Sequence, residues 1–259
     1  MVADRQLKYR AGMALVRCAM ALDQEQTAVD TLLMIEREYP GDAEVLYIAT
    51  HYFSEMGMRA SRELQVRAPN SFQARKLEAE SLESQGKDED AAVIYNKILE
   101  DNPKTPGIHY RLGQIDLAKA GASGSTSEAK QEFMKETEVD PLNAAAHFVL
   151  GELARRSNEW DEAVRYFSKA ATLDVGFSEA YLALGMSLAA SGKYSEAVSP
   201  LRSYVKMQPD DPAGHYQLAL AYSRTGDKEG AAREMALQVK AAASAQRPAD
   251  TLEGHSIHP

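Results

Sequence analysis

The side chains best suited to chemistry in this sequence are three histidines that recur at equivalent places. His109, His147 and His215 each occupy the fourth place of segments that begin at residues 106, 144 and 212 and share one pattern. Zinc holds its nitrogen ligands at about 2 Å, whereas packed neighbouring helices lie roughly 8–10 Å apart. The three histidines therefore cannot share a metal ion. We interpret them as packing residues at the junctions between segments.

The rest of the sequence predicts no reaction centre. It contains no nucleophile elbow, no phosphate-binding glycine loop and no paired metal-ligand spacing. The glycine- and serine-rich segment 121–127 is not followed by the Gly-Lys-Ser/Thr run of a phosphate loop, so we interpret it as a flexible loop. We therefore expect a protein that is not an enzyme and that holds no metal and no cofactor.

A pattern of small and large apolar residues returns about every 34 residues between Tyr9 and Ala245. In the clearest copy, 178–211, the residues at helical spacing are Tyr181, Leu184, Gly185 and Leu188, then Ala197, Leu201 and Tyr204. Gly192 separates the two faces as a left-handed cap would, and Pro209 stops the second helix. A period of this length predicts an array of copies of one helix-turn-helix unit.

Residues at fixed places in each copy predict the turns and the helix contacts. The fifteenth place is held by residues that tolerate a left-handed cap: Gly57, Gly86, Asn158, Gly192 and Gly226. Glycine or alanine at the eighth place, and alanine at the twentieth, predict a close approach of the paired helices.

The chain resembles the tetratricopeptide repeat family. The resemblance rests on Leu184, Gly185, Ala197, Leu201 and Pro209 and on their equivalents in the other copies. The resemblance implies an all-α fold, a right-handed α-solenoid of about seven stacked helix-turn-helix repeats within residues 1–245. The expected repeats lie near 9–42, 43–71, 72–105, 106–143, 144–177, 178–211 and 212–245, followed by a disordered tail at 246–259. The copy at 43–71 is five residues short, so we expect its second helix, near 59–67, to be brief.

The resemblance also implies where a partner binds, because in this family the first helix of each repeat lines the inside of the superhelix. The predicted partner-binding residues are Tyr47, His51, Tyr110, Gln114, Phe148, Glu152, Arg155, Leu182, Met186, Tyr216 and Leu220. Four of them form a ladder at the fifth place of successive repeats: Tyr110, Phe148, Leu182 and Tyr216. Core places two residues further on, about 200° round the helix, are already filled by leucines, so we expect the ladder to be exposed. Burial of the ladder by crowding is the alternative.

Composition limits the classes of partner. The net charge is −9, from 29 basic and 38 acidic residues, and no long basic stripe occurs, so we expect no binding to nucleic acid. No stretch of 18 apolar residues occurs, so we expect no membrane insertion. The opening residues lack the layout of a secretory signal, which indicates a cytoplasmic protein as written, or a periplasmic or secreted one if a leader was removed. Cys18 falls on an expected helix and is predicted to be a small buried residue.

Three functions remain after these exclusions. The first is a protein interaction scaffold that binds a peptide or partner helix in the concave groove. The second is the substrate-recruiting module of a larger enzyme. The third is self-assembly into a homo-oligomer through the C-terminal helix at 228–245, where no polar capping helix follows. The acidic segment 78–101 is either a patch for a basic partner or a solvated pair of helices.

Overall fold

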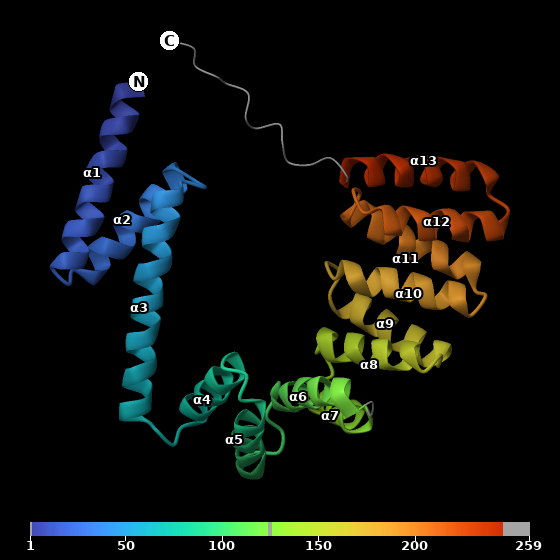
Figure 1. Ribbon diagram of the computed structural model, residues 1–259, viewed down its shortest axis with the longest axis horizontal. Coiled ribbons are helices and arrows are strands. Elements are labelled where there is room, and N and C mark those ends of the chain that lie inside the picture. Colours follow the sequence, from blue (N-terminus) through green and yellow to red (C-terminus); the bar gives the residue numbers. More distant parts are fainter. Residues whose placement is uncertain (1, 124–125, 246–259) are drawn as a thin grey trace. The chain divides into compact units, whose positions relative to one another are not determined.

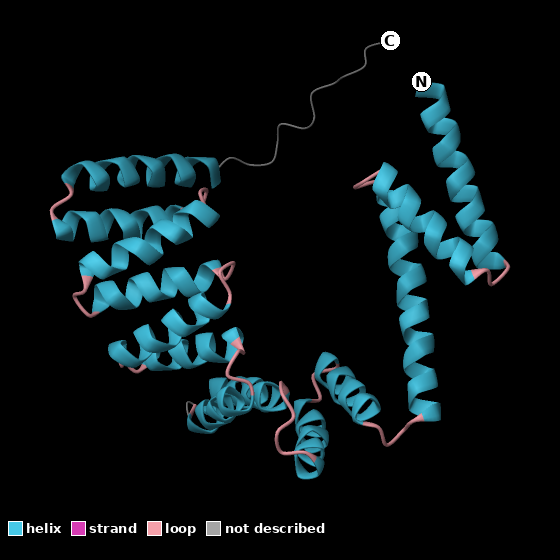
Figure 2. Ribbon diagram, turned by 180° about the vertical axis from the view of Figure 1, so that it is seen from behind, coloured by secondary structure: helices cyan, strands magenta, loops and turns pink. Residues whose placement is uncertain are grey.

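The computed structural model describes residues 2–123 and 126–245, and within these ranges the regular structure is entirely helical (Figures 1 and 2). The thirteen helices described are α1 (Val2–Ala21), α2 (Glu25–Glu38), α3 (Ala43–Arg67), α4 (Phe72–Ser84), α5 (Asp88–Asp101), α6 (Ile108–Ser123), α7 (Ser127–Val139), α8 (Ala144–Arg156), α9 (Trp160–Leu173), α10 (Ser178–Ala190), α11 (Tyr194–Met207), α12 (Pro212–Thr225) and α13 (Lys228–Ala245). The predicted all-α fold is confirmed. The predicted tail at 246–259 lies outside the described residues.

The chain forms two compact units, Met1–Glu78 and Ala79–Pro259, which divide within α4. The core of the first unit lies among α1, α2 and α3. Its most deeply buried side chains include Val16, Leu32 and Val45. Asp42 caps the N-terminus of α3, because its carboxylate accepts hydrogen bonds from the backbone N–H groups of Glu44 and Val45.

Helix α3 differs from the predicted pair of helices at 43–71. It continues without a break from Ala43 to Arg67, and Gly57 is not among the residues with positive φ. Glycine costs only about 1 kcal/mol relative to alanine inside a helix, and the shortened segment has too few residues for a turn. The predicted cap at Gly57 and the brief second helix near 59–67 are therefore wrong.

Cys18 is exposed rather than buried. The buried residues beside it on α1 are Val16 and Ala19. Since Cys18 lies about 200° round the helix from Val16, it points away from the core. The predicted role as a small buried residue is wrong, because the apolar stripe of α1 runs through other positions.

In the second unit the helices pack in chain order, each against the next, from α5 to α13. Figure 1 shows α8 to α13 as successive stacked layers. The turns within pairs follow the predicted caps: φ is +71° at Gly86, +59° at Asn158, +79° at Gly192 and +87° at Gly226. At these four positions the left-handed caps are confirmed.

Small residues let the paired helices approach closely, as predicted. A Cβ atom added at Gly151 would lie 2.7 Å from the ring of Phe167, and one added at Gly185 would lie 2.4 Å from Cγ of Leu201. Ala163 and Ala197, at the twentieth place of the same repeats, are fully buried. Each first helix therefore has one fixed packing face, and this face determines which of its side chains remain for the opposite side.

Candidate partner-binding groove

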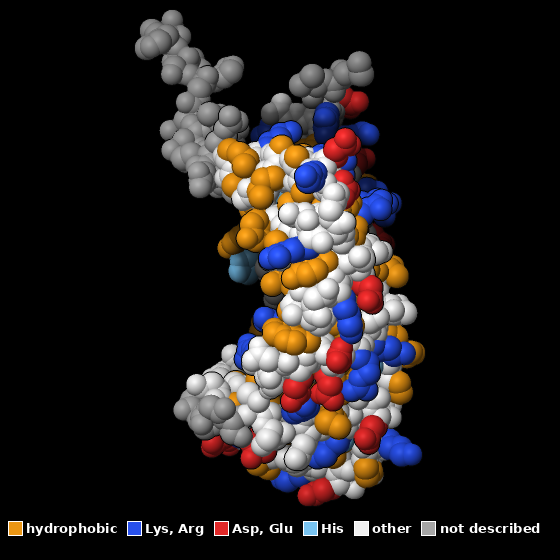
Figure 3. Space-filling view, turned by 90° about the vertical axis from the view of Figure 1, so that its right-hand side faces the viewer, with side chains coloured by type: hydrophobic (Ala, Val, Ile, Leu, Met, Phe, Trp, Pro, Cys, Tyr) orange, Lys and Arg blue, Asp and Glu red, His pale blue; other side chains and the backbone are white. Residues whose placement is uncertain are grey.

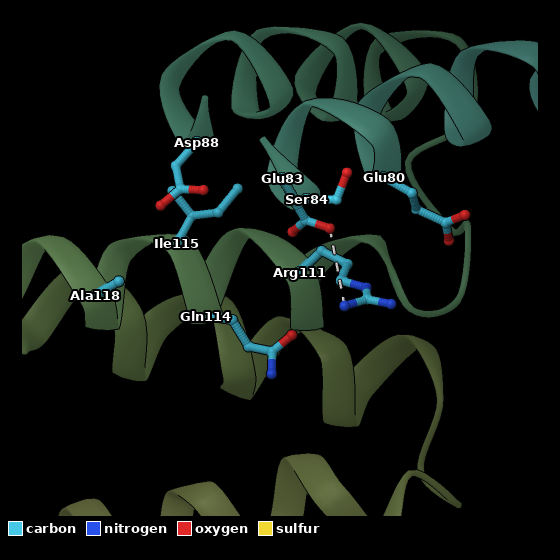
Figure 4. A pocket seen from close by; sticks show the side chains of 8 residues that line it. All are labelled: Glu80, Glu83, Ser84, Asp88, Arg111, Gln114, Ile115 and Ala118. Carbon is cyan, nitrogen blue, oxygen red and sulfur yellow. Dashed lines mark ion pairs between the residues drawn. The ribbon is translucent and has the colours of Figure 1, made fainter. Parts of the chain in front are cut away.

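A hollow of about 660 Å³ lies between the first helices of two successive repeats in the second unit (Figure 4). Its lining side chains are Glu80, Glu83 and Ser84 of α4, Asp88 of α5, and Arg111, Gln114, Ile115 and Ala118 of α6. Gln114 belongs to the predicted partner-binding set, and Figure 4 shows it on α6, the same helix as Arg111. We call the surface formed by this hollow and by the fifth-, ninth- and twelfth-place residues of α6, α8, α10 and α12 the inner groove.

The carboxylate of Glu83 is fixed at the edge of this hollow. It accepts a hydrogen bond from the hydroxyl of Tyr95 at 3.0 Å, and Nη1 of Arg111 lies 3.8 Å from it. Burial, followed by the negative charge of Glu83, raises the pKa of Tyr95 above its ordinary value. The Tyr95 hydroxyl therefore stays a donor at neutral pH, and a ligand in the hollow meets a preorganised carboxylate.

The aromatic ladder is half-buried over most of its length. The ring of Tyr110 packs edge-on against Phe133 at a centroid distance of 5.5 Å, and burial raises the pKa of Tyr110. Phe148 packs against Phe167 at 5.4 Å and against Phe177 at 4.8 Å.

Only part of the predicted exposure is therefore observed. Leu182 is also half-buried, against the core formed with Leu201. Tyr216 is 48% exposed. The predicted open ladder is observed fully at Tyr216 alone, because neighbouring rings and the core cover part of each other member.

The polar and aliphatic members of the predicted set also lie on first helices. Glu152 and Arg155 satisfy each other through two hydrogen bonds of 3.0 and 2.8 Å, and the bond to Glu152 raises the pKa of Arg155. Met186 and Leu220 are half-buried. A ligand along α8 therefore meets an ion pair already formed, and one along α10 and α12 meets an apolar surface.

Tyr47 and His51 lie in the first unit, on α3, and are described with that unit alone. Tyr47 is 66% exposed, and its ring meets the ring of His51 edge-on at 4.4 Å. Because α3 is one continuous helix, the repeat register that assigned these two residues to an inner face does not apply to it. Their role in binding stays a prediction.

Several residues of the hollow were not among the predicted partner-binding residues. The family resemblance assigns the second, fifth, ninth and twelfth places of each repeat to the inner face. Glu80 and Glu83 occupy the ninth and twelfth places of the repeat at 72–105, so this rule includes them. Arg111 occupies the sixth place, which the rule does not include. Its presence in the hollow depends on the packing of α6 against α5 rather than on a sequence signal.

The three histidines pack as the sequence indicated, and two of them contact a glutamate on the second helix of the same repeat. Nδ1 of His109 lies 2.7 Å from Oε2 of Glu132, and Nδ1 of His215 lies 2.8 Å from Oε2 of Glu234. Nε2 of His215 also contacts the backbone carbonyl of Pro209 in the preceding repeat, at 3.0 Å. His215 is thus a buried residue at a repeat junction.

Charge and hydropathy are mixed on one face of the protein. Acidic and basic side chains are interspersed with hydrophobic ones over the face shown in Figure 3. Among the described helices, none combines the length and the apolar character that crossing a bilayer requires. The inner groove is the candidate site of the second unit, since it combines a hollow with half-buried apolar side chains.

Models of the tetratricopeptide repeat match much of the chain. One matches residues 108–174 and again 182–248, and a second matches residues 77–105. A curated relative, anaphase-promoting complex subunit 6 of Arabidopsis thaliana, is 28% identical over 128 residues. This match covers 49% of the chain but only 23% of the relative, so the chain spans about a quarter of that protein's length.

Two solved structures share the fold. YrrB, described as a tetratricopeptide repeat protein with an unusual peptide-binding site, is 22% identical, with a TM-score of 0.59 over 70% of this chain and 92% of YrrB. MamA from Desulfovibrio magneticus RS-1, solved from residue 41 to its end, is 16% identical, with a TM-score of 0.56 over 68% of this chain and 97% of the solved chain. At these identities the likeness is one of fold alone.

Proposed function

The chain belongs to the tetratricopeptide repeat family, and on this premise we propose that it is a non-enzymatic scaffold that holds a peptide or partner helix in the inner groove. The observation that carries the proposal is the hollow between α4 and α6 beside a row of half-buried apolar side chains. Side chains held on one side by the core lose little conformational freedom when a partner covers the other side.

The chemistry of the inner groove favours an amphipathic ligand. Tyr216, Leu220 and Met186 offer apolar contact, whereas the hollow offers the fixed carboxylate of Glu83 and the amide of Gln114. A peptide or helix with apolar anchors at regular spacing and a polar end would satisfy both parts. The description of YrrB as peptide-binding is consistent with this mode in a protein of the same fold.

Selection from a peptide library tests the proposal. Peptides selected on the whole chain are expected to lose affinity at least tenfold for Tyr216→Ala combined with Met186→Ser, because two apolar anchors worth about 1 kcal/mol or more each are removed. Phe53→Ala combined with Met58→Ser changes similar side chains on α3, both of them exposed and outside the predicted partner-binding set, and serves as the control pair. Unchanged affinity for the first pair, with helicity intact, would remove the proposal.

Self-assembly is the second candidate function, and one observation favours it. Helix α13 exposes Met235 at 45% and Val239 at 62%, one turn apart on the same face. A second copy that covers these side chains would bury apolar surface that water otherwise contacts. Light scattering across a concentration series tests it. A monomer at all concentrations excludes it, whereas a dimer that Val239→Lys dissociates supports it.

Two further statements rest on the sequence rather than on the site. We propose a cytoplasmic location for the chain as written, and fractionation of cells that express the full gene tests it. Recruitment of substrate to an enzyme is the third candidate function, and the full-length gene decides it, since a catalytic domain encoded in the same chain would support it.

A further inference from the structure

Two of the three equivalent histidines are paired with a glutamate on the second helix of the same repeat. His109 contacts Glu132, and His215 contacts Glu234. In each case the contact is made by Nδ1. Each of these two repeats therefore has a carboxylate of its own beside the histidine ring.

His147 has the same setting as His215 but not the same partner. Its Nε2 lies 3.2 Å from the backbone carbonyl of Pro141, just as Nε2 of His215 lies 3.0 Å from that of Pro209. Nineteen residues after each histidine, however, the sequence has Tyr166 in one repeat and Glu234 in the other. Nδ1 of His147 is buried and has no hydrogen-bond partner within the described part of the chain.

In each of the other two repeats one cationic side chain lies beside the glutamate, at a different place in each. The repeat that contains His147 has a cationic residue at both of these places. Lys135 holds Glu132 at 2.6 Å, and its equivalent here is Lys169. Arg233 lies 3.4 Å from Glu234, and its equivalent here is Arg165. The repeat at 144–177 therefore keeps the histidine and both cationic places, and has a tyrosine where the carboxylate belongs.

These side chains border a pocket on the side of α8 that packs against α9. Its volume is about 370 Å³, and its lining residues are His147, Arg165, Tyr166, Ser168, Lys169 and Thr172. The guanidinium of Arg165 lies over the ring of Tyr166, 4.4 Å from its centroid, so both are held at the rim. None of the lining residues belongs to the inner groove.

We propose that this pocket is a carboxylate-binding site, in which an acidic group from outside the chain takes the place that Glu132 and Glu234 hold in the other repeats. Nδ1 is closed to solvent in the conformation described, so the carboxylate contacts it after the Tyr166 ring, whose centroid lies 6.2 Å from that of the His147 ring, turns aside. Arg165 and Lys169 then lie beside the carboxylate. Aspartate and glutamate side chains of a partner and small organic acids share this chemistry. The site is separate from the inner groove and does not depend on the function proposed for it.

The proposal includes a dependence on pH. Nε2–H of His147 donates to the Pro141 carbonyl, so Nδ1 must gain a proton to donate to a carboxylate. Burial lowers the pKa of His147, and the positive charges of Lys169 and Arg165 act in the same direction, against the opposite effects of the hydrogen bond to the Pro141 carbonyl and of the charge of Asp140. A bound carboxylate raises the pKa of His147, so affinity increases as pH falls and levels off below the pKa of the free site.

The direct test follows the ring signals of His147 by NMR while the whole chain is titrated with three probes. The probes are a blocked hexaglutamate peptide, acetate and inorganic phosphate, with blocked hexaglutamine as a neutral control. Saturable shifts and a raised pKa of His147 with both carboxylate probes support a general carboxylate site. Shifts with hexaglutamate alone support the acidic segment of a partner as the source. Shifts with phosphate alone, or with none of the probes, overturn the proposal.

Substitutions make the test specific. Tyr166→Glu supplies the internal carboxylate of the other repeats, so it should abolish the shifts and raise the pKa of His147 without any probe. Lys169→Gln should weaken binding up to about fivefold, the value of one exposed ion pair. Lys97→Gln changes the equivalent exposed lysine of the repeat at 72–105 and should leave binding unchanged.

Two results contradict the assignment even if a probe binds. Retained binding in a folded Tyr166→Glu variant would show that the carboxylate place is not the site. Equal weakening by Lys169→Gln and Lys97→Gln would show attraction to net charge only. If Tyr166→Glu does not fold, as circular dichroism would show, the comparison between the two lysine variants decides the proposal alone.

Discussion

Gly185 of α10 lies directly against Leu201 of α11, so that a Cβ atom at position 185 would sit 2.4 Å from Cγ of that leucine. Leu201 is fully buried, and its branch point cannot move aside without shifting the helix pair. The absence of a side chain at Gly185 therefore sets the distance between two helices of the second unit. The same relationship recurs between Gly151 and Phe167.

Gly185→Ala is expected to lower the free energy of unfolding by about 1–2 kcal/mol. Overpacking a core costs about 1–3 kcal/mol, and the higher helix propensity of alanine offsets up to about 1 kcal/mol of this. Chemical denaturation followed by circular dichroism measures the change. Gly121→Ala is the matched control, because a Cβ atom there meets nothing within 4 Å. A variant at Gly185 as stable as the parent would contradict the packing described.

Gly57→Ala tests the continuous helix α3. Gly57 lies inside α3, and a Cβ atom there meets nothing within 4 Å, so alanine should stabilise the first unit by up to about 1 kcal/mol. Gly192→Ala should do the opposite in the second unit, because φ there is +79° and alanine is strained at positive φ. Destabilisation by Gly57→Ala in thermal unfolding would indicate a turn at that position instead.

Glu136→Ala is expected to destabilise the second unit by about 2–4 kcal/mol. The Glu136 side chain is fully buried and accepts hydrogen bonds from the backbone N–H groups of Gly107 and Tyr110 at 2.8 and 3.1 Å, and from Nδ2 of Asn143 at 3.1 Å. Its removal leaves these donors unsatisfied. Hydrogen exchange at the start of α6 should speed up most, because two of the donors are there. Uniform changes across all helices would contradict this specific role.

Asp42 is expected to lose its capping contribution in acid. Hydrogen bonds from the backbone N–H of Val45 and from the Tyr9 hydroxyl outweigh burial and lower the pKa of Asp42 below its ordinary value of 3.8. The stabilisation is therefore complete above the unfolded pKa and is lost as pH falls through the lower, folded pKa. Carboxyl NMR titration measures this pKa directly. In the Asp42→Asn variant, the free energy of unfolding of the first unit should vary less with pH over this range than in the parent protein. The same pH dependence in the variant and the parent would exclude the effect.

Much of the fold could be predicted from the sequence, because local rules coincide with packing in most repeats. Glycine or asparagine at the fifteenth place predicts the left-handed caps, and Gly185 with Ala197 predicts a close pair of helices. The rule fails at Gly57, where the residue type fits a cap but the segment has too few residues to turn. Glycine permits both conformations, so chain length decides between them.

The candidate site was less predictable, because its exposure depends on contacts between residues distant in sequence. The sequence predicts that Phe148 is exposed, but the ring of Phe177, which precedes α10, packs against it at a centroid distance of 4.8 Å. Arg111 lies outside the positions that the family resemblance assigns to binding, yet it lines the hollow with Gln114. Tyr216 has no aromatic ring packed against it among the described residues and stays exposed.

The central claim is that the inner groove holds the partner, and site-specific photo-crosslinking tests it most directly. A photoreactive residue at Gln114, Met186 or Tyr216 is expected to capture a peptide selected on the unmodified chain. The same residue at Lys97 or Glu196, both exposed on second helices, is expected to capture none. Efficient crosslinks at the two control positions, with none at the three groove positions, would contradict the claim.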